Sequence, residues 1–268
     1  MGTKPNYPVQ TTNRSLDIIE ALKEGGPQGV SKLADDLDMS KSIVHNHLAT
    51  LEDRGYVLGD DGTYRISFKF LGIGGYNRKQ LNLYSDGRPE VEKLAAETGE
   101  MASLATEERG WCVYLFQAKG EQAVKLEVNY EGMHEHMHST ALGKALLAYF
   151  PDERIHDVVE RHGLPKHTEQ TITSREALFE DLETVRERGY AVDDQESIPG
   201  LRCMAAPIKK GDNKIVGSVS VSGPVSRIKD DRWTERLPEL ISNTANVIEI
   251  NTQYSSTGST YQNGRATE

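Results

Sequence analysis

Three histidines at alternating positions, His134, His136 and His138, have the spacing of a possible metal site. In an extended chain, side chains two residues apart project from the same side. Three imidazoles on one side of a strand could hold a zinc ion, because imidazole nitrogen is a preferred zinc ligand. The same spacing fits a partly exposed histidine-rich loop or strand without metal. The second interpretation is favoured, so we expect no bound metal.

Cys203 is the residue whose surroundings could make a nucleophile. With the acidic residues Asp193 and Glu196 and a distant histidine, it could form a cysteine-dependent catalytic site. A reactive cysteine needs surroundings that stabilise the thiolate, and the only cation next to Cys203 is Arg202. The apolar residues that follow fit a buried wall better. We therefore expect no catalytic residues.

The first quarter of the chain contains three short helical patterns followed by the pattern of a hairpin. Apolar residues recur at helical spacing over residues 15–23, 30–37 and 40–54. Residues 56–58 and 64–67 have the pattern of two strands around a turn at 59–62. Two short helices, a turn, a third helix and a hairpin predict a winged helix-turn-helix DNA-binding domain. A small helical protein-interaction module is the alternative.

The third helix is the one expected to enter the major groove. Ser40 is a plausible N-cap, and Val44, Leu48 and Leu51 share the inward face. The outward face carries short polar, hydrogen-bonding side chains that suit base edges. The residues predicted to contact DNA are Ser40, Lys41, Ser42, His45, Asn46, Thr50 and, in the wing, Arg65.

The sequence resembles the IclR family of transcription regulators in both halves. The first half matches in Arg14-Ser15-Leu16-Asp17-Ile18, Ser40-Lys41-Ser42, Leu48-Ala49-Thr50-Leu51-Glu52 and Arg54-Gly55-Tyr56-Val57. The second half matches in Gly189-Tyr190-Ala191-Val192-Asp193, Glu196, Cys203-Met204-Ala205, Ile208, Ser139-Thr140-Ala141-Leu142-Gly143-Lys144-Ala145 and Ser220-Val221-Ser222-Gly223-Pro224. Departures from the family pattern are Ile43 for a common Thr, Asn46 for a common Arg, and Lys209-Lys210 at the end of the second-half signature.

The resemblance implies an α+β fold in which the winged helix-turn-helix is joined by a linker helix to a GAF-like effector-binding domain with an antiparallel sheet. The expected divisions are a flexible tail at 1–9, the DNA-binding domain at 10–68, the linker helix at 69–86, the effector-binding domain at 87–254 and a disordered tail at 255–268. Helices are expected at 68–84, with a possible bend at Gly74-Gly75, and at 89–98, 140–150, 152–162, 175–188 and 236–251. Strands are expected at 101–106, 111–118, 123–128, 190–193, 204–208 and 215–222.

The predicted effector pocket takes its residues from several parts of the second domain. Alternate side chains of a strand share a face, so Ser218, Ser220 and Ser222 lie together. By itself this row fits a solvated strand face, and the resemblance favours a pocket. The helix that begins near Thr140 has free amides that favour an anion. The predicted effector-binding residues are Thr140, Ala141, Leu142, Asp193, Cys203, Ser220 and Ser222.

Charge is the main argument against a DNA partner. The chain has a net charge of −10, and residues 1–68 hold seven Lys and Arg against ten Asp and Glu, a net charge of −3. DNA affinity normally rests on cations that neutralise phosphates. An acidic surface also suits a protein that works in concentrated salt, where charges are strongly screened. We interpret the acidity as adaptation to salt, consistent with a halophilic source.

The sequence thus predicts a cytoplasmic, sequence-specific DNA-binding transcription regulator controlled by a small polar metabolite, either an organic acid or a sugar-derived acid. Expected partners are double-stranded operator DNA, the effector and further copies of the chain, as a dimer or the dimer of dimers that the resemblance implies. We expect no cofactor, no enzymatic activity and no membrane span, because no apolar run approaches about 20 residues. The alternatives are a metal-responsive regulator using His134, His136 and His138, a cysteine-dependent enzyme, and a ligand-binding adaptor without DNA contact.

Overall fold

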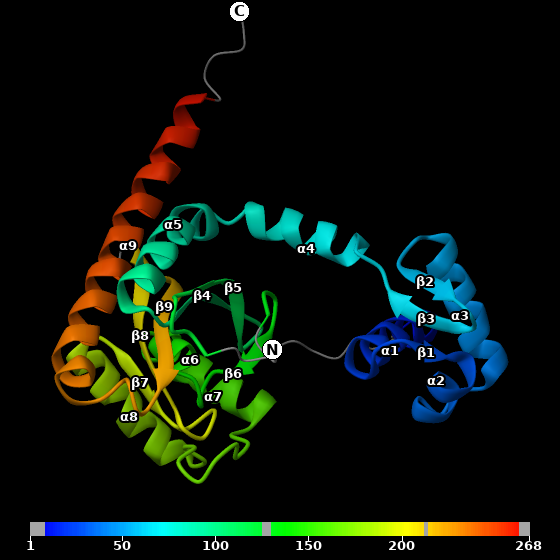
Figure 1. Cartoon of the computed structure of the whole chain (residues 1–268), viewed down its shortest axis with the longest axis horizontal. Helices are drawn as coiled ribbons and strands as arrows, with labels where there is room; N and C mark the ends of the chain where they lie inside the picture. Colours follow the sequence, from blue (N-terminus) through cyan, green and yellow to red (C-terminus); the bar gives the residue numbers. More distant parts are fainter. Residues whose placement is uncertain (1–8, 125–129, 212–213, 263–268) are drawn as a thin grey trace, which may run out of the picture. The chain divides into compact units, whose positions relative to one another are not determined.

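The computed structural model describes residues 9–124, 130–211 and 214–262, with side chains up to residue 254. The chain divides into two units, Met1–Asn77 (unit 1) and Arg78–Glu268 (unit 2). Figure 1 shows the helices and strands of each unit in sequence colours. None of the described helices is long and apolar enough to cross a membrane.

Unit 1 is the predicted winged helix-turn-helix. Its helices are α1 (Gln10–Gly25), α2 (Val30–Asp36) and α3 (Lys41–Asp53). Its strands are β1 (Gln28–Gly29), β2 (Val57–Asp60) and β3 (Thr63–Ile66), which form an antiparallel sheet in the order β1-β3-β2. The three helices and the hairpin predicted from the sequence are therefore confirmed, and β1 is an additional strand that was not predicted.

Local chemistry explains where α3 and the hairpin begin and end. The Ser40 hydroxyl accepts a hydrogen bond from the backbone N–H of Ile43 at 3.3 Å, which makes Ser40 the N-cap of α3 as predicted. Between β2 and β3, Asp61 and Gly62 have φ angles of 44° and 76°. Positive φ at both central residues is typical of the two-residue turns that match strand twist. The turn is thus shorter than the four residues predicted.

The linker segment differs from its prediction. Helix α4 (Lys69–Lys79) continues through the two glycines expected to bend it, and α5 (Asn82–Thr98) starts before Pro89. The reason lies in the packing of α5 on the sheet of unit 2. Leu83 is buried, and a Cβ on Gly87 would lie 2.8 Å from Leu104 Cδ2, so the first turns of α5 are held closely against a strand. This contact offsets the cost of a proline inside the helix.

The core of unit 2 is a six-stranded antiparallel sheet in the order β6-β5-β4-β9-β8-β7. Its strands are β4 (Met101–Glu108), β5 (Trp111–Lys119), β6 (His134–His136), β7 (Ala191–Asp194), β8 (Leu201–Lys210) and β9 (Lys214–Pro224). A strand was predicted at 123–128. Residues 123 and 124 are not part of a strand, so the prediction is wrong there, and residues 125–128 lie outside the described residues. The edge strand that pairs with β5 is instead β6, which contains two of the three alternating histidines.

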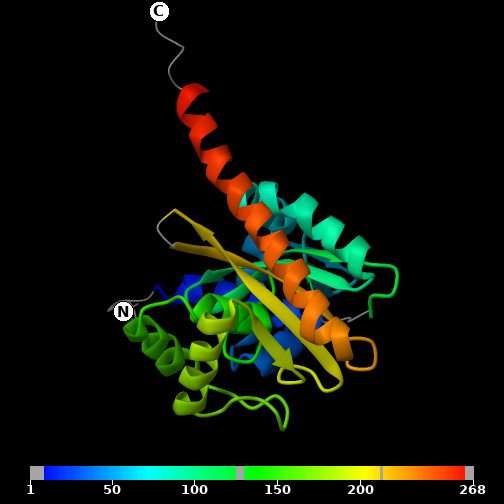
Figure 2. The ribbon, with the colours of Figure 1, turned by 90° about the vertical axis from the view of Figure 1, so that its left-hand side faces the viewer.

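Helices cover both faces of this sheet and make separate cores. Helices α5 and α9 (Leu237–Gln262) lie on one face, as Figure 2 shows for α9, which crosses the strands. The other face is covered by α6 (Ala141–Leu147), α7 (Asp152–His162) and α8 (Arg175–Arg188). A π-helical turn, Arg232–Arg236, leads into α9. Because α9 continues to Gln262, the predicted boundary at 254/255 falls inside a helix, and residues 263–268 lie outside the described residues.

The separate core of unit 1 can be tested with Leu48→Ala. Leu48 is fully buried, so the cavity should lower the free energy of unfolding of unit 1 by about 2–5 kcal/mol. Both tryptophans, Trp111 and Trp233, lie in unit 2. In urea titrations we expect an earlier circular-dichroism transition for unit 1 and an unchanged tryptophan fluorescence transition. Leu16→Ala, at an exposed position, is the control. Equal shifts in both signals would contradict independent cores.

Candidate functional site

The residues predicted to contact DNA all lie at the surface of unit 1. They are exposed on α3, at its N-cap and on β3: Ser40, Lys41, Ser42, His45, Asn46, Thr50 and Arg65. Val44 and Leu48, on the opposite side of α3, are fully buried in the core of unit 1. His47 ties α3 to α1, since its Nδ1 lies 2.8 Å from the Ser15 hydroxyl. The buried face and this contact hold the outward face of α3 free for a partner. Contact of these residues with DNA stays a prediction.

The residues predicted to bind an effector come together around one cavity of about 170 Å³ in unit 2. The cavity lies between the sheet, the start of α6 and the loops that follow α7 and β7. It is lined by Tyr114, Glu135, Thr140, Ala141, Leu142, His167, Asp193, Ser197, Ile198, Leu201, Cys203, Ser220 and Ser222. All seven predicted residues are in this set, although ligand binding there stays a prediction.

The register of β7, β8 and β9 brings the polar side chains that line the cavity next to one another. Cys203 on β8 pairs with Ser222 on β9 and with Asp193 on β7, so the three side chains lie in one row across the sheet. Ser220, two residues from Ser222, faces the same way. The Ser220 hydroxyl is buried, and no hydrogen-bond partner for it is present among the described residues. Ser218, predicted for the same face, instead donates to the carbonyl of Leu142 at 3.0 Å and anchors α6.

Two carboxyl groups line the cavity, and they differ in the hydrogen bonds that they accept. The Asp193 carboxylate accepts hydrogen bonds from the backbone N–H groups of Glu196 and Ser197 and from the Ser197 hydroxyl. Burial raises the pKa of Asp193. Burial also raises the pKa of Glu135, and the nearby charge of Asp193 adds to the effect. Among the described residues none donates a hydrogen bond to the Glu135 carboxylate. Asp193 therefore organises the turn after β7, whereas Glu135 lines the cavity without taking part in that turn.

A buried ammonium group lies behind the cavity wall. Lys144 is fully buried on α6, and its Nζ lies 2.6 Å from Glu196 Oε1 and 3.0 Å from Asp181 Oδ2. Burial raises the pKa of Glu196 to about 7, and the neighbouring charges of Asp193 and Asp181 contribute, while Lys144 opposes the shift. One ammonium among three carboxyl groups cannot neutralise all of them. Lys144 thus fixes α6 against the loop after β7 and does not line the cavity itself.

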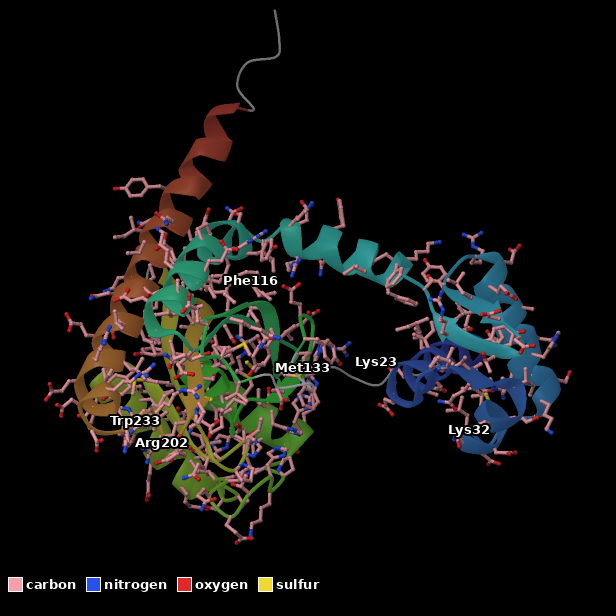
Figure 3. All side chains as sticks on the ribbon, in the orientation of Figure 1. Lys23, Lys32, Phe116, Met133, Arg202 and Trp233 are labelled. Atoms are coloured by element: carbon pink, nitrogen blue, oxygen red, sulfur yellow. The ribbon has the colours of Figure 1, made fainter. Side chains whose placement is uncertain are left out.

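The thiol of Cys203 lacks the surroundings of a nucleophile. Burial raises the pKa of Cys203 well above its ordinary value, with the charge of Asp193 as the second cause. The neighbouring Arg202 points to the other face of the sheet, where it pairs with Asp194 and stacks over the ring of Trp233 at 5.1 Å (Figure 3). The thiol is therefore kept protonated, which disfavours the cysteine-dependent enzyme.

The alternating histidines form an aromatic cluster. His136 packs against Trp111 with ring centroids 4.8 Å apart and against His167 at 5.4 Å. His138 Nε2 lies 3.1 Å from the carbonyl oxygen of Pro165, and burial lowers the pKa of His138 to about 4. Within residues 9–124, 130–211 and 214–262, no group of three or more His, Cys, Asp and Glu side chains is arranged to hold a metal ion. The metal-responsive alternative has no support in this arrangement.

The two halves of the chain match the two parts of one protein family. Residues 11–61 match the IclR helix-turn-helix domain, and residues 77–250 match the bacterial transcriptional regulator IclR C-terminal domain. The chain belongs to the IclR family.

IclR relatives match along most of their length. The chain is 35% identical over 246 residues to a probable HTH-type transcriptional regulator ArcR of Halobacterium salinarum, covering 90% of this chain and 93% of that protein. It is 32% identical over 232 residues to the transcriptional repressor IclR of Escherichia coli, covering 85% and 84%. The crystal structure of the Thermotoga maritima IclR superposes with a TM-score of 0.74 at 28% identity, covering 91% and 99%. The protein is thus a DNA-binding transcription regulator of the IclR type.

Several cavity residues were not predicted from the sequence, and Tyr114, Glu135 and His167 are the ones among them with ionisable groups. One signal for Glu135 was present in the sequence: it alternates with His134 and His136, so a strand there must turn it to the opposite face. Glu135 pairs with Cys112 on β5, and Cys112 belongs to the core on the α6 side of the sheet. The Glu135 side chain therefore lies on that side as well. No local signal identifies His167, because it reaches the cavity from a long loop.

The raised pKa of Glu196 predicts a pH dependence that Glu196→Gln removes. The folded state holds a proton on Glu196 up to about pH 7, whereas the unfolded state releases it near the ordinary glutamate pKa of 4.5. Its stabilising contribution is therefore full below about pH 4.5 and is lost as the pH rises through about 7. In urea titrations from pH 5 to pH 8, the free energy of unfolding of the wild type should fall relative to Glu196→Gln. A constant difference would show that burial does not raise this pKa.

Proposed function

We propose that this IclR-family regulator reads its operator with the outward face of α3 and the wing, and that a small polar metabolite in the cavity of unit 2 controls the affinity for DNA. The observation that carries the proposal is the joint exposure of seven hydrogen-bonding or basic side chains on and beside α3. A helix with this position and these side chains suits base and phosphate contacts in the major groove.

The acidic charge of unit 1 limits which interactions can supply affinity for DNA. Since residues 1–68 have a net charge of −3, few phosphates can be neutralised by Lys and Arg. Affinity must then come from hydrogen bonds to bases, from shape and from the pairing of two copies on one operator. Binding of this kind depends less on salt than binding through many phosphate contacts.

We propose that α4 pairs copies of the chain. The helix has no buried residue, and its apolar side chains Leu71 and Tyr76 are 69% and 71% exposed. Phe68 just before it and Ile73 within it are exposed as well. Large apolar side chains that are exposed in this way are stabilised when a second copy covers them. A dimer, or a dimer of dimers, would present paired recognition helices to a pseudo-palindromic operator.

The cavity fits the proposed effector in size and polarity. A volume of about 170 Å³ is below that of most drug-sized sites, and its wall offers hydroxyl, carboxyl and imidazole groups. Such a site suits a metabolite of only a few carbon atoms. The narrower class indicated by the sequence, an organic acid or a sugar-derived acid, stays a prediction.

DNA reading can be tested by fluorescence anisotropy with the protein's own upstream DNA and a scrambled duplex, from about 0.2 M to 1 M salt. We expect Asn46→Ala to weaken binding to the upstream duplex by about 5–150-fold without changing binding to the scrambled one, since a base contact is lost. Arg65→Ala should weaken binding to both and reduce the salt slope by about 1.

Lys32→Ala is the control, because Lys32 is exposed on α2 and pairs with Asp36. Equal binding of the two duplexes by the wild type at every salt concentration would leave a ligand-binding adaptor instead of a regulator.

The pairing role of α4 predicts that Leu71→Glu lowers the association of copies, because a charge would be buried at the interface. Sedimentation velocity should show a larger monomer fraction for Leu71→Glu than for the wild type. Asn77→Glu, also exposed on α4, adds the same charge at a position that is already polar and should behave as the wild type. An unchanged mass for Leu71→Glu would place the interface elsewhere.

A further inference from the structure

The loop between α7 and α8 contributes to the wall of the cavity of unit 2. Residues 163–174 form neither helix nor strand, and His167 in this loop lines the cavity. The hydroxyl groups of Thr168 and Thr171 fasten the loop, because they donate to the carbonyl oxygens of Gln195 and Glu196, each at 2.7 Å. Long connections without secondary structure commonly act as lids over binding sites. The loop is therefore placed and fastened as a lid would be.

Three imidazole rings meet where this loop contacts β6. His136 lies on β6, His138 follows the strand, and His167 lies on the loop. The ring centroid of His136 is 5.7 Å from that of His138 and 5.4 Å from that of His167, and the last two are 6.1 Å apart. The hydrogen bond between His138 and the carbonyl of Pro165 attaches the loop to the same segment. Neutral rings can pack in this way, but two protonated rings at such a distance repel each other.

Burial holds the imidazoles of His136 and His138 in the neutral form. It lowers the pKa of His136, and nearby His167 and His162 add to the effect. It lowers the pKa of His138 to about 4, although the hydrogen bond with Pro165 opposes the shift. When the loop opens, the rings meet more water and move toward the ordinary histidine pKa of about 6.5. The open loop thus takes up protons that the closed loop excludes, so the closed form is most stable above about pH 6.5 and loses stability as the pH falls.

The charged groups around these rings do not turn the repulsion into attraction. Lys144 on α6 is a cation and lowers the pKa of His138 further. Asp181 on α8 pairs with Lys144, and within the loop Lys166 pairs with Glu169 at 2.8 Å. The buried carboxyl groups near the cavity lose charge as the pH falls, because burial raises the pKa values of Glu135, Asp193 and Glu196.

The aromatic side chains beside the rings add no negative charge either. Two further imidazoles, His134 on β6 and His162 on α7, pack with His136 around Trp111 and can only add positive charge. Tyr114 on β5 stays neutral, because burial raises its pKa well above the ordinary value. Acid therefore increases the positive charge where the loop meets β6.

We propose that residues 163–174 form a proton-controlled lid on the cavity of unit 2, and that protonation of His136, His138 and His167 moves the loop away from β6. The inference rests on the proposed function where it concerns the effector, because the lid would control access to the cavity assigned to it. The opening itself requires neither DNA nor ligand. At neutral pH the loop stays closed, and below about pH 6.5 it opens more often.

Hydrogen exchange of the full chain without ligand, followed by mass spectrometry from about pH 7.5 to about pH 5, measures the opening. The backbone N–H groups of His167, Thr168 and Gln170 donate to the hydroxyl groups of Thr168 and Thr171, so these amides report on the closed loop. After correction for the intrinsic pH dependence of exchange, the opening constant should rise by up to about tenfold per pH unit for each proton taken up. Peptides from β4 and β9 are the reference within the same unit.

Two variants each remove one ring of the cluster. In His136→Gln and in His167→Gln, the rise of the opening constant toward about pH 5 should be smaller by at least about threefold, because one proton fewer is taken up. His156→Gln is the control, since the His156 ring packs against Phe179 at 5.0 Å, outside the cluster. It should behave as the wild type. Circular dichroism verifies that each variant is folded.

Access to the cavity is measured at Cys203, which lines it, in a Cys112→Ala background that leaves one thiol. At about pH 5, labelling by 4,4′-dithiodipyridine should be at least about threefold faster in this background than with His167→Gln added, and the two rates should agree at about pH 7.5. Comparison at equal pH removes the effect of pH on the thiol itself.

Three results would overturn the proposal: opening that does not change with pH, an equal pH dependence in the wild type and both histidine variants, or opening without faster labelling of Cys203. All three are measured without DNA or ligand, so they leave the proposed regulator untouched. Proton-dependent opening in a protein without operator specificity would support the lid and refute the proposed function.

Discussion

The cavity of unit 2 depends on the antiparallel register of β8 with β9. Cys203 pairs with Ser222 and Ala205 with Ser220, and these side chains face α6. The residues between them, such as Met204 and Val221, face α5 and α9 in the opposite core. A slip of one residue would exchange the two faces, placing valines in the cavity and serine hydroxyls among apolar side chains. The two separate cores therefore fix the register, and the register fixes the polar wall.

Features that depend on residue spacing or capping within a single helix or strand could be predicted from the sequence. The buried face of α3, the N-cap at Ser40 and the serine row of β9 all follow from spacing within one element. The prediction failed where tertiary contacts decide. Helix α5 begins before Pro89 because Gly87 fits closely against the sheet, and β6 forms at the histidines because β5 offers an edge. Lys144 in its buried ion pairs has no local signature, since its partners lie far along the chain.

Charge has a different task in each unit. In unit 1 the acidic balance leaves few cations for phosphates, so the proposed function assigns most of the discrimination between sequences to the exposed polar side chains of α3. In unit 2 the one fully buried ammonium group, among the described residues, is used to fix α6 against the loop after β7.

We propose that two copies of α3 bind one operator together. Hydroxyl-radical footprinting of the protein's own upstream DNA tests this most directly, because it shows where the backbone is covered without assuming a sequence. Paired binding should give two protected segments whose centres lie about one helical turn, roughly 10 base pairs, or a multiple of it apart. Uniform protection along the duplex, or none, would contradict sequence-specific reading by paired recognition helices.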